Sequence, residues 1–541
     1  MAVAPLCICA GAARQVLYSA PHLPVDLEQF VQRSLRLRSR IVILLRIILF
    51  SVALPVVYLG VASGAFYYRL RVRNTANDAA SLPLLRAFTS NDRVLIVAPH
   101  CDDETLGAAG LIQRVVAAGG VAESVIITNG DAYPAAVERQ QRVLKATPTD
   151  YVQFAMLRQK ESQQAGKRLG VQKVLFLGYP DRGLMDMWER FWNVGQPYYS
   201  TYTCSARSPY PNTYNKNSEY CGEDLTRDLA SIVSDFKPTL VVVAHPGEDH
   251  TDHAAAANFV TLAVMQTKAK EQNQAWARNI ELMHYLVHRG DWPLPQGKHP
   301  EARLLPPVTL AGLDTNWFTL FLTKSELANK ASAIEMYPSQ TAIMPGFMQA
   351  FARKSELFGT IPERTLDVTL PSEQFESAIS SRESPEPLLR DPIRDSLIRD
   401  MQGGADIAAL YCTADAAFLH IGIETRLPIS SSYRYRLIMR SFARDWQTHG
   451  NACSVDIEPD SSVNAESTIK FRTKGSRLTV DIPWRVLSAE SDGEPASAIS
   501  VAAVTYLKSI PVEVDRTETR LVKLLNNASV QTQINRQVKV P

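Results

Sequence analysis

Short apolar runs alternate with amphipathic stretches in the first half of the chain, and this pattern predicts an α/β fold. Buried strands are expected where nearly every residue is apolar: residues 93–98, 124–128, 174–177 and 239–244. Helices are expected where apolar residues recur every three or four positions: residues 105–118, 157–169 and 225–236. Strands that alternate with helices in this way form a parallel sheet with helices on both faces.

The pattern changes in the second half of the chain. The spacing over residues 316–358 is again helical, which extends a Rossmann-like α/β domain to about residue 365. Residues 380–400 are polar and rich in proline, as linkers are. Beyond them, short alternating runs with turn residues between them predict a β-sandwich over residues 366–541. The aromatic-rich loop at residues 185–221 either stacks on a sugar or packs its rings together.

A long apolar segment precedes the α/β pattern. Residues 47–68 are almost wholly apolar, and about 20 such residues span a bilayer as a helix. We expect a single-pass anchor over residues 41–70 and a linker with helical character over residues 71–92. More arginines precede the segment than follow it, so residues 1–40 are expected to be cytoplasmic and the catalytic part extracytoplasmic. The alternative is a buried helix of a soluble domain.

Composition restricts the partners. The 541 residues carry a net charge of +2, which gives no electrostatic reason to expect nucleic acid as a partner. Seven cysteines are too few for a disulfide scaffold. In an oxidising compartment Cys204 can pair with Cys221, and Cys412 with Cys453; otherwise all four are free thiols.

Two polar clusters follow two of the predicted strands. The run PHCDDE occupies residues 99–104, and the run HPGEDHTDH occupies residues 245–253. Because α/β proteins place their sites at the carboxyl ends of parallel strands, we expect the two runs to meet. His100, Asp103 and His253 then offer two imidazoles and one carboxylate, a ligand set that catalytic zinc sites combine with one open position for water.

Asp102 and His250 complete the parts of a hydrolytic site. Zinc lowers the pKa of bound water towards about 7 and polarises a carbonyl group. Asp102 remains available to take a proton from the water and to pass one to a leaving amine. His250 either stabilises the developing oxyanion or acts as the acid. Together these groups are suited to the hydrolysis of an amide.

The run PHCDDETLG, followed downstream by GEDHTDH, resembles the LmbE/PIG-L family of zinc-dependent N-acetylglucosaminyl deacetylases. The likeness extends over residues 93–358. It implies that Zn²⁺, or another divalent metal, is held by His100, Asp103 and His253. It also implies that Asp102 is the general base and that His250 is the acid or the oxyanion partner.

The resemblance also points to residues that contact substrate. Arg158 and Asp181 match positions that hold substrate hydroxyl groups in some members. The alternatives are a surface charge paired with Glu161 for Arg158 and a turn cap for Asp181. Cys101 stands where the family usually has proline, so a rigid backbone position is lost but no ligand is; an extra ligand role for this thiol is the minor alternative.

Three further histidines lie outside the motif positions. His245 is expected to support the site or the structure around it. His284 and His288 are expected on one strand after the site. His288 can approach the pocket from there, but a packed side chain is the favoured interpretation.

The C-terminal region resembles, more loosely, the DOMON or family-9 carbohydrate-binding β-sandwich, through AFLHI at residues 417–421 and LTVDIP at residues 478–483. Together with the apolar segment at residues 47–68, these resemblances imply a membrane-tethered zinc hydrolase that removes acetyl groups from N-acetylglucosamine-type sugars or glycans. The alternatives are a related amidase that acts on a sugar-thiol conjugate and an inactive, membrane-anchored glycan-binding protein.

Overall fold

The computed structural model describes most of the chain, in two units that divide after Tyr68. The described residues are 40, 42–54, 56–61, 63–64, 68, 81–290, 292–367, 386–393, 402–415, 417–443, 446, 452–460, 468–487 and 496–525.

The N-terminal unit contains a helix that is long and apolar enough to cross a membrane. It runs over Val42–Val61, and none of it is buried within the protein. Among the described residues, no other helix meets that description. A helix of this kind near the N-terminus is compatible with a membrane span and with a signal sequence. Nearly all of the predicted cytoplasmic segment, and residues 71–80 of the predicted linker, lie outside the described residues.

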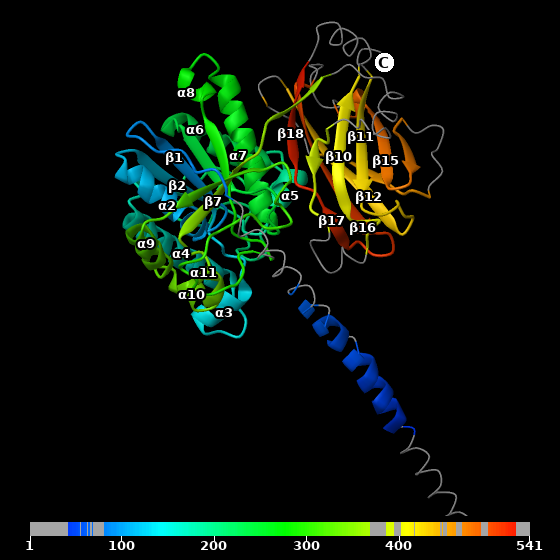
Figure 1. Cartoon of the computed structure of the whole chain (residues 1–541), viewed down its shortest axis with the longest axis horizontal. Coiled ribbons are helices and arrows are strands. Elements are labelled where there is room, and N and C mark those ends of the chain that lie inside the picture. The colour runs from blue at the N-terminus through cyan, green and yellow to red at the C-terminus, as the bar shows by residue number, and fades with distance from the viewer. Residues whose placement is uncertain are drawn as a thin grey trace, which may run out of the picture. The chain divides into compact units, whose positions relative to one another are not determined.

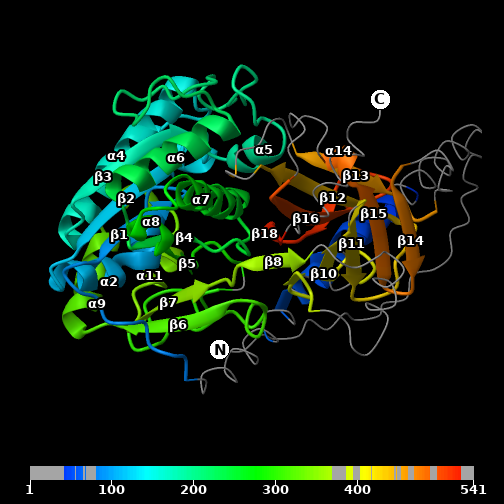
Figure 2. The same cartoon turned by 90° about the horizontal axis from the view of Figure 1, so that it is seen from above.

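A seven-stranded sheet organises residues 93–360. Its strands are β1 (Arg93–Ala98), β2 (Val121–Thr128), β3 (Lys173–Tyr179), β4 (Leu240–Ala244), β5 (Glu281–Tyr285), β6 (Asn316–Phe321) and β7 (Ser355–Thr360). Figure 1 shows this sheet with β1, β2 and β7 labelled, and Figure 2 shows the spatial order β3-β2-β1-β4-β5-β7-β6. The first five strands are parallel, and β7 is antiparallel to both of its neighbours. The predicted parallel α/β architecture is therefore confirmed. The antiparallel strand β7 lies between β5 and the edge strand β6.

Helices cover both faces of this sheet, because successive side chains of a strand point to opposite faces. Val94 and Ile96 of β1 share a core with α2 (Asp103–Ala117), α4 (Pro148–Leu169) and α9 (Lys324–Ile334). Leu95 and Val97 share another core with α5 (Leu184–Glu189), α6 (Gly222–Phe236) and α7 (Thr251–Lys270). Figure 2 shows α2 and α9 on one side of the strands and α6 and α7 on the other. The remaining helices are α3 (Pro134–Gln141), α8 (Ala275–Arg278), α10 (Pro338–Thr341) and α11 (Pro345–Gln349).

The helical prediction for residues 316–358 is confirmed in the middle of that range and wrong at its two ends. The structure has β6, then α9 to α11, then β7. Glu356 lies buried within β7 and pairs with Lys330 at 2.7 Å while accepting the backbone N–H of Gly110 at 2.7 Å. A buried carboxylate in the strand removes the apolar signal on which the prediction depended. The helical character predicted for the linker is also absent from its described part, residues 81–92.

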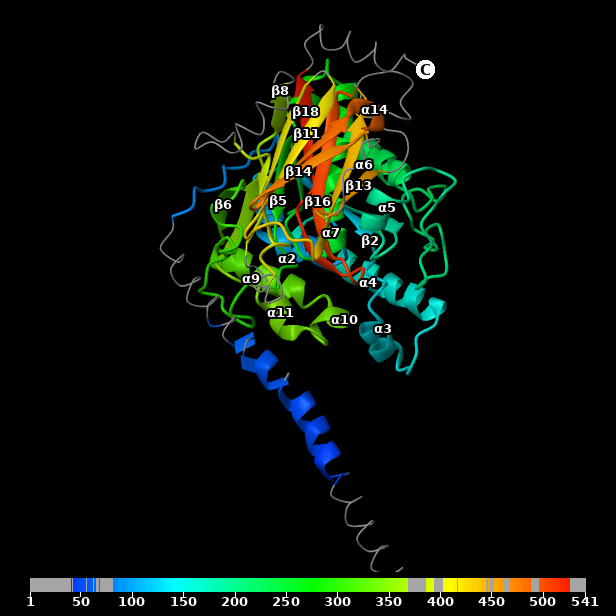
Figure 3. The same ribbon diagram turned by 90° about the vertical axis from the view of Figure 1, so that its right-hand side faces the viewer.

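Beyond β7 the chain is rich in β structure and forms two further sheets. One has the order β14-β15-β11-β10-β9, and the other has the order β13-β12-β16-β18-β8, with β17 beside β16. Figure 2 labels most of these strands, and Figure 3 shows the same region turned by a right angle from Figure 1. Buried side chains of both sheets, such as Leu410 and Leu437, belong to one apolar core. The predictions of a β-sandwich and of carbohydrate binding are compatible with this arrangement and remain predictions. The elements are β8 (Arg364–Asp367), β9 (Leu389–Arg390), β10 (Ile407–Ala414), β11 (Phe418–Thr425), β12 (Tyr433–Phe442), β13 (Cys453–Ile457), β14 (Lys470–Lys474), β15 (Arg477–Pro483), α14 (Trp484–Leu487), β16 (Ala498–Leu507), β17 (Glu513–Arg516) and β18 (Arg520–Leu525).

The β-rich region packs against the α5 segment of the first domain. Arg440 of β12 is buried, and its guanidinium carbon lies 4.0 Å from the centre of the Trp192 ring. The same guanidinium donates a hydrogen bond to the backbone carbonyl of Trp188. Both tryptophans are themselves buried, so at these two positions the aromatic-rich loop packs internally.

Of the two possibilities for the cysteines, free thiols are found. Cys204, Cys221, Cys412 and Cys453 are all unpaired as disulfides.

Candidate metal centre

The two predicted polar runs meet where β1 and β4 lie side by side. The chain leaves β1 for α2 on one face of the sheet and leaves β4 for α7 on the other. Such a switch point opens a crevice at the carboxyl ends of the strands, which is where open α/β sheets bind ligands. His100, Asp102 and Asp103 come from the β1–α2 turn, and His250 and His253 come from the start of α7.

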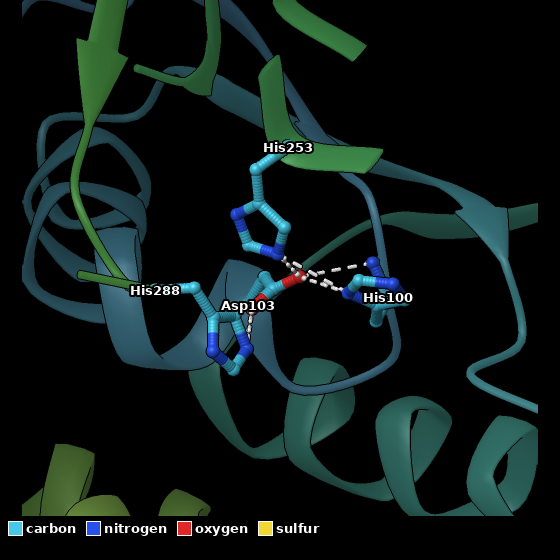
Figure 4. A group of neighbouring side chains, drawn as sticks. All are labelled: His100, Asp103, His253 and His288. Atoms are coloured by element: carbon cyan, nitrogen blue, oxygen red, sulfur yellow. Dashed lines mark hydrogen bonds and ion pairs between the residues drawn. The ribbon is translucent and has the colours of Figure 1, made fainter. Parts of the chain in front are cut away.

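Three of these side chains converge as the sequence predicted. His100 Nδ1 lies 3.2 Å from Asp103 Oδ2 and 3.1 Å from His253 Nε2, and the latter two atoms are 3.1 Å apart (Figure 4). Donor atoms arranged tetrahedrally around zinc at 2.0–2.1 Å lie about 3.3 Å from one another. All three side chains are buried, and Asp103 Oδ1 has no hydrogen-bond partner in the described part of the chain. The donor set and its spacing fit a divalent cation.

A carboxylate stands behind each of the two histidines. Glu248 Oε2 lies 2.9 Å from His253 Nδ1. Asp181 Oδ1 and Asp252 Oδ2 lie 3.3 and 3.5 Å from His100 Nε2. A carboxylate in this position holds the proton on the far ring nitrogen and leaves the near nitrogen free to bind a cation. Asp181 therefore contacts the site directly and does not merely cap a turn.

Asp102 precedes Asp103 in the β1–α2 turn and has a strained backbone conformation. Its φ of +122° is one that L residues rarely adopt. Arg158 Nη2 lies 3.2 Å from Asp102 Oδ1, and the guanidinium also donates to the carbonyls of Cys101 and Gly130. Burial raises the pKa of Asp102 to about 8 although the charge of Arg158 opposes that effect. A carboxyl group with such a pKa exchanges protons near neutral pH.

Arg158 is not the surface charge of the alternative interpretation. Its side chain is buried with 5% of its surface exposed, and Glu161 accepts hydrogen bonds from Ser339 instead.

His250 caps the start of α7. Its Nδ1 accepts the backbone N–H of Asp252 at 3.3 Å, which places the imidazole proton on Nε2. The His250 ring centre lies 4.7 Å from that of His100. Burial, with the neighbouring His100 and His253, lowers the pKa of His250 to about 2. A neutral imidazole in this position is a hydrogen-bond donor rather than a cation.

His288 belongs to this cluster, as the less favoured of its two interpretations from sequence had it. It lies three residues beyond the end of β5, and its Nε2 is 3.7 Å from Asp103 Oδ1 (Figure 4). Ligand atoms of His100, Asp103, His253 and His288 all lie within 4.8 Å of one another. Because β5 is parallel to β4, the residues that follow β5 lie at the same edge of the sheet as those that follow β4.

The other candidate residues have structural surroundings. Cys101 packs with Ala98, Ile126 and Phe176 in a small apolar cluster, away from the ligand atoms. His245 Nε2 contacts Thr315 Oγ1 at 2.8 Å and stacks on Trp317. His284 Nδ1 faces the carbonyl of Ala244 at 3.2 Å, as expected for a packed histidine.

Similarity to known proteins follows the same part of the chain. Residues 95–264 match the profile of the family described as "PIG-L: GlcNAc-PI de-N-acetylase". A 1D-myo-inositol 2-acetamido-2-deoxy-alpha-D-glucopyranoside deacetylase of Actinosynnema mirum is 27% identical over 272 residues, which cover 47% of this chain and 83% of that protein.

Two solved structures give lower identities. The N,N'-diacetylchitobiose deacetylase of Pyrococcus horikoshii is 16% identical with a TM-score of 0.31, covering 50% of this chain and 85% of that one. The zinc-inhibited form of a teicoplanin deacetylase is 18% identical with a TM-score of 0.30, covering 49% of this chain and 97% of that one. The profile match and the Actinosynnema relative, together with the motifs, lead to the conclusion that residues 95–264 form a domain of the PIG-L (LmbE) family.

Proposed function

We propose that this protein is a zinc-dependent hydrolase that removes acetyl groups from N-acetylglucosamine-type sugars or glycans. The observation that carries the proposal is the convergence of His100 Nδ1, Asp103 Oδ2 and His253 Nε2 within 3.2 Å of one another, beside Asp102, in a PIG-L family domain. The Actinosynnema relative, by its name, deacetylates a 2-acetamido sugar, which supports the same substrate class.

The reaction that these residues suit is amide hydrolysis. A divalent cation held by His100, Asp103 and His253 would supply Lewis acidity and lower the pKa of water. Asp102 accepts a proton as the water oxygen adds to the acetyl carbonyl carbon. The same carboxyl group then returns the proton to the sugar nitrogen as the C–N bond breaks, so that acetate and a free amine leave. His250 donates a hydrogen bond to the carbonyl oxygen as negative charge develops on it.

Arg158 and Asp181 are proposed to orient the sugar. Arg158 Nε is buried without a hydrogen-bond partner in the described part of the chain, so the guanidinium keeps one N–H donor that is not used within the protein. Asp181 contacts His100 through one oxygen and accepts the N–H of Ala132 at 2.7 Å through the other, which holds the carboxylate beside the reacting centre. Hydroxyl groups of a bound sugar would complete these contacts.

The flanking regions are proposed to place the enzyme near its substrate. The Val42–Val61 helix would tether residues 93–365 to a membrane, with those residues on the extracytoplasmic side. Residues 366–541 would hold a glycan. Neither role is needed for the chemistry, so deletion of the helix should change the location of the activity and not its rate.

The direct test is the release of acetate from a panel of N-acetylated sugars and glycan fragments. We expect release by the zinc-loaded protein, loss of release with a chelator, and recovery on addition of Zn²⁺. Asp102→Ala should retain zinc and lose about 10²- to 10⁴-fold in kcat, because general acid–base catalysis contributes that much. Wild-type turnover by Asp102→Ala would remove it as the base. A zinc-loaded wild type that hydrolyses no acetylated sugar would refute the proposed function.

A further inference from the structure

His288 stands next to the three ligand atoms without completing their arrangement. Its Nε2 is 3.7 Å from Asp103 Oδ1, which is longer than a hydrogen bond. Neither ring nitrogen of His288 makes a hydrogen bond within the described part of the chain. The Nε2 atom of His288 therefore faces Asp103 without a hydrogen bond to it.

The backbone of His288 is fixed relative to the ligand residues. Its N–H donates to Glu248 Oε2 at 2.5 Å, and Glu248 Oε2 also lies 2.9 Å from His253 Nδ1. Its carbonyl accepts the N–H of Asp249 at 3.0 Å. The loop that follows β4 thus holds both His253 and His288, so the two rings keep their relative positions.

The ring itself is also held. It stacks on Phe347 of α11, with ring centres 5.2 Å apart and planes inclined by 21°. It meets His253 edge-on, with ring centres 4.7 Å apart. These two contacts leave the Nε2 edge directed towards Asp103 (Figure 4).

Exposure indicates the side from which a substrate enters. The His288 side chain is 30% exposed, whereas the side chains of His100, Asp103 and His253 are 6%, 0% and 0% exposed. His288 is therefore the member of the cluster that an incoming molecule meets first.

From these observations we propose that His288 is a further catalytic residue, whose Nε2–H donates a hydrogen bond to the carbonyl oxygen of the acetamide bound at the candidate metal centre. This inference rests on the proposed function. His250 approaches the cluster beside His100, and His288 approaches it beside His253, so the two imidazoles hold the same oxygen from two sides. Two preorganised donors aimed at one developing oxyanion are a recurring arrangement in acyl-transfer sites.

The test compares His288→Ala and His288→Gln with the wild type. His299→Ala is the matched control, because His299 lies in the same connection between β5 and β6 and its ring contacts the carbonyl of Gln296, away from the candidate metal centre. We expect kcat for acetate release to fall about 10²- to 10³-fold in His288→Ala, the usual cost of one oxyanion donor, while the zinc dissociation constant stays within about twofold. The Gln variant keeps a donor and should recover part of the loss.

A second measurement does not depend on turnover. Acetate presents an oxygen like that of the substrate carbonyl, so calorimetric titration of acetate into the zinc-loaded protein should give weaker binding in His288→Ala and unchanged binding in the control. A zinc dissociation constant raised tenfold or more in His288→Ala, with kcat restored at saturating zinc, would overturn the inference by making His288 a metal ligand. So would an unchanged kcat in an active enzyme. A wild type that binds zinc and acetate but deacetylates nothing would refute the proposed function as well.

Discussion

Glu248 offers a sharp test of how the candidate metal centre is organised. It is almost fully buried, and its carboxylate contacts His253 Nδ1 at 2.9 Å and accepts the backbone N–H groups of Val287 at 2.8 Å and His288 at 2.5 Å. Glu248→Gln keeps the shape of the side chain and removes its charge. The substitution therefore changes the support of His253 without removing any ligand.

The size of the effect follows from these three contacts. An amide offers one acceptor oxygen where the carboxylate offers two, and its NH₂ group opposes an N–H donor. At least one hydrogen bond to a charged group is lost, which costs about 1.5–3 kcal/mol. Loss of a carboxylate behind a metal-binding histidine lowers metal affinity by about 10- to 100-fold. We therefore expect the zinc dissociation constant to rise by that factor and the metal-free protein to lose about 1.5–3 kcal/mol in free energy of unfolding.

Competition with a chromophoric chelator gives the zinc dissociation constant, and urea unfolding followed by circular dichroism gives the stability. Asp249→Asn is the matched control, because it removes a carboxylate one residue away whose side chain caps the N–H of Gly290 and contacts no histidine. The reasoning is refuted if Glu248→Gln binds zinc as tightly as the control does.

Three further outcomes concern stability. Burial disfavours charge on His420, but the hydrogen bonds that its ring donates to Asp415 and Asp481 outweigh that effect and raise its pKa to about 9. Because the folded-state pKa of His420 is raised, its protonation stabilises the folded protein fully below the unfolded value of about 6.5. The free energy of unfolding should therefore fall by about 1–2 kcal/mol between pH 6.5 and pH 9. Urea titrations should show no such fall in His420→Gln. Arg440→Met should separate the melting of the two regions in calorimetry, because Arg440 links β12 to the tryptophans of the first domain; one unchanged transition would contradict that link. Lys330→Met leaves the buried carboxylate of Glu356 without its ion-pair partner and should lower the free energy of unfolding by about 3–5 kcal/mol. A decrease below about 1 kcal/mol in urea unfolding would show that the ion pair is not needed for stability.

Sequence patterns predicted the half of the sheet that positions the site. β1 and β4 are buried on both faces, so their residues are uniformly apolar and their ends are marked by polar runs. The far edge of the sheet escaped prediction because its strands carry polar residues with buried partners. Glu356 in β7 is the clearest case, since its partners Lys330 and Gly110 are distant in sequence.

The candidate site was predicted where its residues belong to the two motifs, and the family resemblance added Arg158 and Asp181. His100, Asp103 and His253 converge because two strand ends meet, which the α/β pattern already implies. His288 comes from a third strand end without a recognisable run of polar residues, and only its position after β5 pointed to it. Glu248 was within a motif, yet its contact with His253 depends on the fold of the loop and has no separate signal in the sequence.

Metal content measured on the purified protein tests the central claim most directly. After exposure to Zn²⁺ and removal of excess metal, elemental analysis should find one zinc per chain in the wild type and in Asp102→Ala, and much less than one in His253→Ala. A full equivalent retained by His253→Ala, or no zinc retained by the wild type, would show that His100, Asp103 and His253 do not hold a shared ion.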